Sequence, residues 1–82
     1  MARYDFEFLS ELYAVETIAK GNSVEQRAYL NRQFGRGRWR KMKGRALIKY
    51  SNGKVTVAEI HWFEAHGIGR KFPKAIRDID NG

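Results

Sequence analysis

The dipeptide Asn52-Gly53 limits the possible folds of this chain more than any other feature, because it separates two runs of strand-forming residues. The stretch from Gly44 to Phe63 reads GRALIKYSNGKVTVAEIHWF. Asn and Gly tolerate the positive φ angles of a two-residue type I′ turn, which makes this pair the strongest short-range signal for a β-hairpin. We therefore predict antiparallel strands over residues 45–50 and 54–63.

A two-residue loop also decides which side chains share a face of the hairpin. In that register Ile48 lies opposite Val57, and Ala46 lies opposite Glu59. The face expected to cover the core is almost wholly apolar and holds Ala46, Ile48, Tyr50, Val55, Val57, Glu59, His61 and Phe63. The face expected to be partly exposed mixes bases with apolar residues and holds Lys43, Arg45, Leu47, Lys49, Thr56, Ala58, Ile60 and Trp62.

Residues 1–35 are predicted to be mainly helical. The segment SVEQRAYLNRQFG begins at Ser23, carries Gln26 three residues later and ends at Gly35, as in a capping box followed by a glycine exit. The segment LSELYAVETIAKG repeats apolar residues every three or four positions, which predicts a helix over about residues 10–19. Residues 4–8 alternate apolar and charged side chains, so a short strand before this helix and one longer helix both remain open.

The segment RKFPKAIRDI predicts a third, irregular strand. Pro73 has no N–H group to donate, which confines that strand to a sheet edge. Together these elements predict an α+β fold, with two N-terminal helices packed on a small, mostly antiparallel sheet of three or four strands. A chain of 82 residues is enough for a single domain, which we expect to span residues 1–82.

The composition excludes several classes of protein. There is no cysteine, so neither disulfides nor a thiolate metal site can form. No apolar run approaches the length of a membrane span, and residues 1–5 lack the apolar core of a secretory signal. We expect a cytoplasmic protein without membrane contact.

The net charge of +7 is distributed unevenly along the chain. Residues 1–30 carry five acids and three bases, whereas residues 31–77 carry thirteen bases and two acids. A solvated basic face that only aids solubility is one explanation. The clustering of the bases favours the other, in which one surface binds a polyanion such as nucleic acid.

The segment RGRWRKMKGR, residues 36–45, holds six bases around one tryptophan. Such basic side chains can neutralise phosphates, and Trp39 can stack on a nucleobase. For Trp39 we favour the alternative of burial between helix and hairpin, because small domains usually need their tryptophans in the core. The predicted nucleic-acid-binding residues are Arg36, Arg38, Trp39, Arg40, Lys41, Lys43, Arg45, Lys71 and Lys74.

The segment EIHWFEAHGIGRK, residues 59–71, contains both histidines of the chain. A helical zinc site of the H-E-x-x-H type needs histidines four positions apart. His61 and His66 are five apart, and the segment starts on a predicted strand. We therefore expect no metal and no cofactor.

Acid–base chemistry fits this segment better. Glu59 and His61 lie two positions apart on a predicted strand, so both project from one face, about 7 Å apart at the backbone. A carboxylate and an imidazole so placed can exchange protons with a ribose and its phosphate, while a cation stabilises the developing charge. We expect His61 to be partly buried and His66, beside two glycines, to be exposed. The candidate catalytic residues are Glu59, His61, His66 and Arg70, and the alternative that we favour is a structural or binding role for them.

The stretch GRGRWRKMKGRALIKYSNGKVTVAEIHWFEAHGIGRK, residues 35–71, resembles a motif of a family of small bacterial domains, with AEIHWFEAHGIG as its most specific part. The layout of helices followed by a basic antiparallel sheet is also similar to that of ribonuclease toxins of the RelE and barnase-like kind. The resemblance to these toxins implies a small metal-independent endoribonuclease with an acidic antitoxin as its protein partner.

Two classes of function follow from these patterns. The first is a basic protein that binds nucleic acid, RNA in preference to DNA, and cleaves it as a toxin-type endoribonuclease. The second is a non-catalytic DNA- or RNA-binding module, and a third alternative is an interaction domain for an acidic protein. RNA cleavage that persists in EDTA and is lost in His61→Ala or His66→Ala selects the first, whereas salt-sensitive binding without cleavage selects the second.

Overall fold

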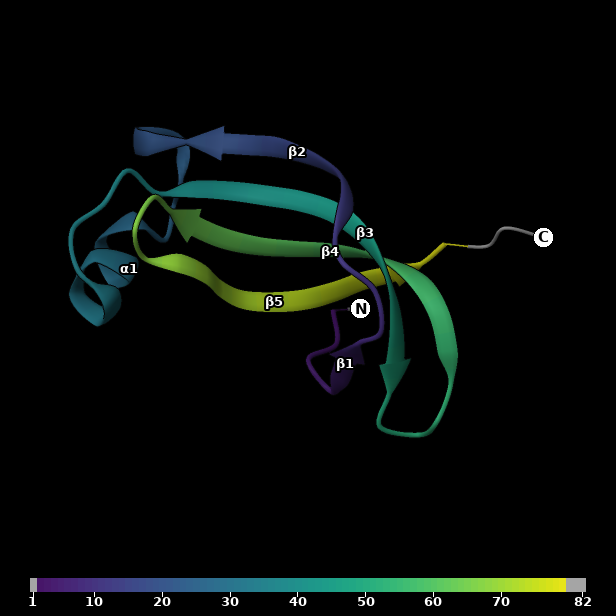
Figure 1. Ribbon diagram of the computed structural model, residues 1–82. Helices are drawn as coiled ribbons and strands as arrows, with labels where there is room; N and C mark the ends of the chain where they lie inside the picture. Colours follow the sequence, from purple (N-terminus) through teal and green to yellow (C-terminus); the bar gives the residue numbers. More distant parts are fainter. Residues whose placement is uncertain (1, 80–82) are drawn as a thin grey trace.

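The structure, a computed structural model, describes residues 2–79 and contains in that part of the chain one curled antiparallel sheet and one α-helix (Figure 1). A 3-10 turn at Gly21–Ser23 and the helix α1 (Arg27–Phe34) connect the second strand to the third. The five strands are β1 (Phe6–Phe8), β2 (Tyr13–Lys20), β3 (Arg40–Tyr50), β4 (Val55–Ala65) and β5 (Gly69–Asp78).

The N-terminal segment closes the sheet into a half-barrel. β3 and β4 form the central hairpin, and β5 pairs with the other edge of β4. β1 and β2 share the remaining edge of β3, where β1 pairs with residues 48–50 and β2 with residues 40–45. Arg3 exchanges two backbone hydrogen bonds of 2.8 Å with Ala75 of β5. Residues 3–8 therefore link β5 to β3, and the sheet curls around them (Figure 1).

The inner face of the curled sheet forms the main core. Its small buried residues let the strands curl tightly, because no bulky side chain separates them; they are Gly44, Ala46, Ala58 and Ala75. The larger members of this cluster are Met42, Ile48, Tyr50, Ile60 and Trp62, and Phe6 and Leu12 of the N-terminal segment pack against them.

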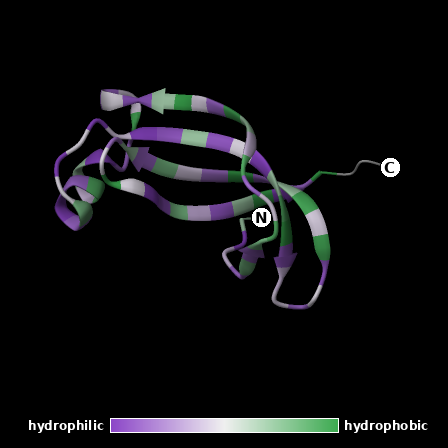
Figure 2. Ribbon diagram, in the orientation of Figure 1, coloured by the Kyte–Doolittle hydropathy of each residue, from purple (hydrophilic) through white to green (hydrophobic). Residues whose placement is uncertain are grey.

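The opposite, outer face carries the alternate residues of the same strands, and Figure 2 shows this alternation as bands of hydrophilic and hydrophobic residues. The helix α1 covers one end of the outer face through a second core of Val24, Leu30, Trp39, Phe63 and Ala65. Trp39 is completely buried there, and its Nε1–H donates a hydrogen bond of 3.0 Å to Asn31 Oδ1. The rest of the outer face is left open beside the helix.

The expected fold of two N-terminal helices on a sheet of three or four strands is wrong. Residues predicted as the first helix form β2, an edge strand, and residues 6–8 form β1. The apolar stripe that suggested a helix is not buried, since Leu9 is 47% and Val15 is 45% exposed. Residues 2–79 therefore form a mostly β, curled half-barrel with a single α-helix.

The remaining helix agrees with the prediction at its end but not at its start. Gly35 has a φ of +104°, and its N–H donates to the carbonyl oxygen of Asn31 at 3.0 Å, which confirms the glycine exit. Ser23 lies in the 3-10 turn, and the helix starts at Arg27 without a side-chain cap. The predicted capping box is therefore wrong.

The hairpin is confirmed, but its predicted register is wrong by one residue. Tyr50 N–H donates to the Lys54 carbonyl and Gly53 N–H donates to the Tyr50 carbonyl, both at 2.9 Å. The loop therefore has three residues, 51–53, and ends with Gly53 at a φ of +92°, as in a turn followed by a glycine bulge. Leu47, not Ile48, lies opposite Val57, so every β4 side chain takes the other face from the one predicted.

The predicted third strand is also confirmed. β5 contains Pro73 and forms the edge of the sheet beyond β4. Its pairing with β4 is interrupted by bulges. A proline is tolerated at such a position because no strand needs its missing N–H.

Candidate nucleic-acid interface

Basic side chains of β3 and β5 lie in rows on the outer face of the sheet. They are Lys41, Lys43, Arg45 and Lys49 of β3 with Lys71, Lys74 and Arg77 of β5, and all are exposed or half-buried. Two of them have acidic partners, since Lys43 Nζ lies 3.5 Å from Glu16 and Arg77 lies 3.0 Å from Glu59. The other five make no ion pair within residues 2–79. This surface, which we call the basic face, is therefore positively charged.

Glu59 and His61 form a hydrogen-bonded pair within the basic face. Glu59 Oε2 lies 2.7 Å from His61 Nε2, and the two side chains are 18% and 17% exposed. The second oxygen of Glu59 accepts a hydrogen bond of 3.0 Å from Arg77. The hydrogen bond with His61 and then the charge of Arg77 hold the pKa of Glu59 below its usual value. Glu59 is therefore a stabilised carboxylate at neutral pH and a weaker proton acceptor than an isolated one.

Cations flank this pair on both neighbouring strands. His61 lies opposite Lys43 of β3 and Lys74 of β5, and Glu59 lies opposite Arg45 and Arg77. The three-residue loop explains this placement, because the shifted register moves Glu59 and His61 from the expected core face to the outer face. A phosphate group held by these cations would lie beside a carboxylate and an imidazole.

His66 lies at the end of the sheet and lines a second basic feature. Here a pocket of about 520 Å³ opens between the end of β2, the start of α1 and the β4–β5 turn. Its cationic lining residues are Lys20, Arg27, Arg38 and Arg40. His66 also lines it, and no acidic residue does. We call this feature the end pocket.

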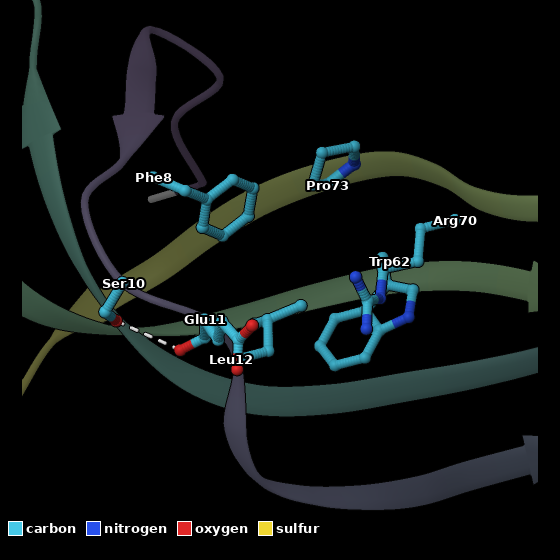
Figure 3. A pocket seen from close by; sticks show the side chains of 7 residues that line it. All are labelled: Phe8, Ser10, Glu11, Leu12, Trp62, Arg70 and Pro73. Carbon is cyan, nitrogen blue, oxygen red and sulfur yellow. Dashed lines mark hydrogen bonds between the residues drawn. The ribbon is translucent and has the colours of Figure 1, made fainter.

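Arg70 points to the inner side of the half-barrel. Figure 3 shows its side chain beside Trp62, and its guanidinium carbon lies 5.9 Å from the centre of that ring. Both residues line a pocket of about 410 Å³, which we call the inner pocket, with Phe8, Ser10, Glu11, Leu12 and Pro73. Trp62 Nε1–H donates to Glu64 at 2.7 Å, and the other oxygen of Glu64 accepts a hydrogen bond from Arg40 at 3.0 Å. Arg70 therefore belongs to the opposite face from Glu59 and His61.

The four candidate catalytic residues are divided between two places. Glu59 and His61 contact each other on the outer face. His66 and Arg70 lie at the β4–β5 turn, where both line a further pocket with Arg40 and Glu64. The four residues do not form one site, because β4 continues to Ala65 and separates His61 from the turn. The expected exposure is confirmed, since His61 is half-buried and His66 is exposed.

Most of the predicted nucleic-acid-binding residues are accessible, but Trp39 is not. Its complete burial under α1 removes the ring from any base-stacking role and confirms the alternative of a core tryptophan. Arg36 and Arg38 are exposed in the segment between α1 and β3. Arg40 is tied to Glu64, whereas Lys41, Lys43, Arg45, Lys71 and Lys74 belong to the basic face.

Several residues at this interface were not predicted from the sequence. Lys20 and Arg27 lie outside the basic segment of the sequence and reach the end pocket only through the fold. Three exposed aromatic residues, Tyr4, Tyr29 and Phe72, converge beside Lys74 in a small pocket between α1 and β5. No local signal could have found this convergence, because the three come from separate segments.

Within residues 2–79, no helix is long and apolar enough to cross a membrane, and no three His, Cys, Asp or Glu side chains group as a metal site would require. No protein-family model matches the chain, and neither the curated proteins nor the solved structures contain a match to it. The case for a function therefore rests on the geometry and charge of these surfaces.

Proposed function

We propose that this protein binds nucleic acid, RNA in preference to DNA, through the end pocket and the adjoining basic face. The observation that carries the proposal is the end pocket, where Lys20, Arg27, Arg38 and Arg40 surround one concavity together with His66. Of these four cations, only Arg40 has an acidic partner within residues 2–79, namely Glu64. Like charges brought together at this density repel one another, and a bound polyanion relieves that repulsion.

The basic face extends the footprint beyond a single phosphate. Arg40 lines the end pocket, and Lys41, Lys43 and Arg45 follow it along β3. Cations spaced along a strand can contact successive phosphates of one chain. A curled, half-open sheet with basic side chains and exposed aromatic residues suits a single-stranded nucleic acid better than a rigid duplex. RNA is therefore the favoured ligand, because sequence-specific recognition of RNA mostly uses single-stranded segments.

A matched pair of arginines on α1 tests this proposal. Arg27 lines the end pocket, whereas Arg32 lies on the same helix, is also exposed and lines none of the pockets described above. We expect Arg27→Ala combined with Arg38→Ala to weaken binding of a labelled single-stranded RNA by about tenfold or more and to make it less dependent on salt. Arg32→Ala removes a charge from the same helix and should change the affinity less than twofold.

The same titrations define the contrary outcome. If Arg32→Ala weakens binding as much per charge removed as the Arg27→Ala, Arg38→Ala double variant does, only the net charge matters and the end pocket is not a site. Circular dichroism and thermal unfolding of each variant show whether the fold is intact, so a loss of binding cannot be mistaken for a loss of structure.

A second candidate function, metal-independent RNA cleavage, rests on the contact between Glu59 and His61 inside the basic face. The imidazole can transfer a proton and the flanking lysines can stabilise a phosphorane. His66 lies beyond the end of β4 and Arg70 lies on the opposite face of the sheet, so neither adjoins this pair. Incubation of labelled RNA in EDTA with the unmodified protein and with His61→Ala tests this activity. Cleavage by the unmodified protein and not by His61→Ala supports this activity. If the RNA stays intact with both proteins, RNA cleavage is ruled out and only the binding function stands.

A further inference from the structure

A small aromatic pocket, distinct from the end pocket, lies between α1 and β5. Its volume is about 210 Å³, and its lining includes Tyr4, Tyr29, Phe72 and Lys74. The three aromatic side chains are 66%, 47% and 42% exposed. Large aromatic residues gain most by burial, so three exposed ones that converge on one hollow are a sign of a ligand. We call this feature the aromatic slot.

Backbone strain at Phe72 holds its ring in this place. From His61 to Phe63, β4 advances two residues while β5 advances three, from Lys74 back to Lys71, so β5 contains a bulge that includes Phe72. Phe72 has a φ of +55°, a conformation that costs a bulky side chain energy. Its ring then lies 6.1 Å from the ring of Tyr29 and 5.4 Å from that of Phe34. Strain of this kind, with an exposed ring as its result, is typical of functional positions.

The charges around the slot select the kind of ligand. Lys74 lines it, Lys71 lies beside it with its Nζ 4.9 Å from the Phe34 ring, and no acidic residue lines it. Lys74 also lies opposite His61, so the slot opens onto the basic face. Its volume is below the roughly 300–1,000 Å³ of pockets for drug-sized ligands and suits a planar group that is part of a larger anion.

We propose that the aromatic slot binds one unpaired nucleobase of a single-stranded RNA, an inference that rests on the proposed function and adds to it a preference for single strands. Tyr29 and Phe72 contact the base, and Lys74 contacts the adjoining phosphate. Bases paired in a duplex are stacked and cannot enter the slot, whereas any unpaired base has a face that an aromatic ring can contact. The slot therefore distinguishes single-stranded from double-stranded RNA more than it distinguishes one RNA sequence from another.

Binding assays with three probes test this inference: a single-stranded RNA, a chain of the same length that lacks its bases, and an RNA duplex. We expect Phe72→Ala and Tyr29→Ala each to weaken binding of the single-stranded RNA by about tenfold, within the range that base–aromatic stacking provides. Binding of the other two probes should not change. Phe72→Gly should act like Phe72→Ala without loss of stability, because glycine adopts a positive φ freely.

Phe8 provides the matched control, since it is 41% exposed and lines the inner pocket on the opposite face. Phe8→Ala should leave the affinity for all three probes unchanged. If the unmodified protein binds the chain without bases as tightly as RNA, or if the Phe72 variants lose affinity for all probes alike, the aromatic slot is not a base site while nucleic-acid binding stands. If the unmodified protein binds none of the probes, the proposed function fails and the slot with it.

Discussion

Leu47 and Val57 lie directly opposite each other across the central hairpin, and both side chains point to the outer face. The backbone groups of Leu47 bond Leu9 and Ser10 on the other side, so this pair makes no hydrogen bonds across the hairpin. Side chains approach each other most closely at such pairs. The same register brings Glu59 and His61 to the basic face, so the placement of the interface depends on it.

The first prediction is that Leu47→Cys combined with Val57→Cys forms a disulfide on mild oxidation. The Cα atoms of a pair of this kind lie about 4.5 Å apart, within the range that a disulfide spans. The chain contains no cysteine of its own, so mass spectrometry reads the result without interference. The matched control, Ile48→Cys with Val57→Cys, places the thiols on opposite faces and should stay reduced. A disulfide in the control and none in the test pair would contradict the register.

The hairpin could be predicted from the sequence, but its register could not. Asn52-Gly53 indicates a turn whether the loop has two residues or three, and the two loops differ in whether Asn52 adopts a positive φ. In the structure only Gly53 does so, while the Asn52 side chain accepts a hydrogen bond from Lys54 N–H at 3.0 Å. A single residue in the loop thus reversed both faces of β4 relative to the prediction.

The strand β2 could not be predicted from periodicity. Its apolar residues fit a helical stripe, yet most of its side chains are exposed and its stability comes from backbone pairing with β3. Such pairing joins residues that are 20 to 32 positions apart in the sequence, from Lys20↔Arg40 to Tyr13↔Arg45. Four residues of β2 are of types favoured in strands: Tyr13, Val15, Thr17 and Ile18. This signal for a strand was present, but the prediction gave more weight to the helical periodicity.

Part of the candidate site could be predicted because it depends on local geometry. Glu59 and His61 are two positions apart on a strand, which alone places them on one face. The end pocket and the aromatic slot depend on how distant segments meet, since Lys20, Arg27 and Phe72 come from three different elements. Sequence spacing carries no information on such meetings.

The second prediction concerns stability in acid. The pKa of Glu59 is lowered in the fold, so its carboxylate stabilises the folded state above its ordinary pKa of 4.5, and this stability is lost as the pH falls through the folded pKa. Glu59→Gln should lower the free energy of unfolding by about 1 kcal/mol at neutral pH, a modest value for a partly exposed pair. The difference between the two proteins should shrink below pH 4.5 in urea titrations. A difference that is constant with pH would show that the ionised carboxylate is not what stabilises the pair.

The third prediction concerns stability in alkali. Burial and then the hydrogen bond of 2.7 Å to Asp78 raise the pKa of Tyr50 from 10.0 to about 12. The neutral phenol therefore stabilises the fold fully below pH 10, and this stability is lost as the pH rises toward 12. Tyr50→Phe should be less stable by about 1 kcal/mol at neutral pH and should lose less stability over that alkaline interval. Tyr13→Phe, at an exposed tyrosine, serves as the control and should follow the unmodified protein.

The most direct test of the central claim is the affinity of the unmodified protein for a labelled single-stranded RNA, measured by fluorescence anisotropy over a series of salt concentrations. Binding through the end pocket and the basic face predicts that the logarithm of the association constant falls linearly with the logarithm of salt. The slope should be roughly −3 or steeper, which corresponds to about four neutralised phosphates on a single strand. No binding at the lowest salt concentration, or an affinity that does not change with salt, would contradict the proposal that these bases form a nucleic-acid interface.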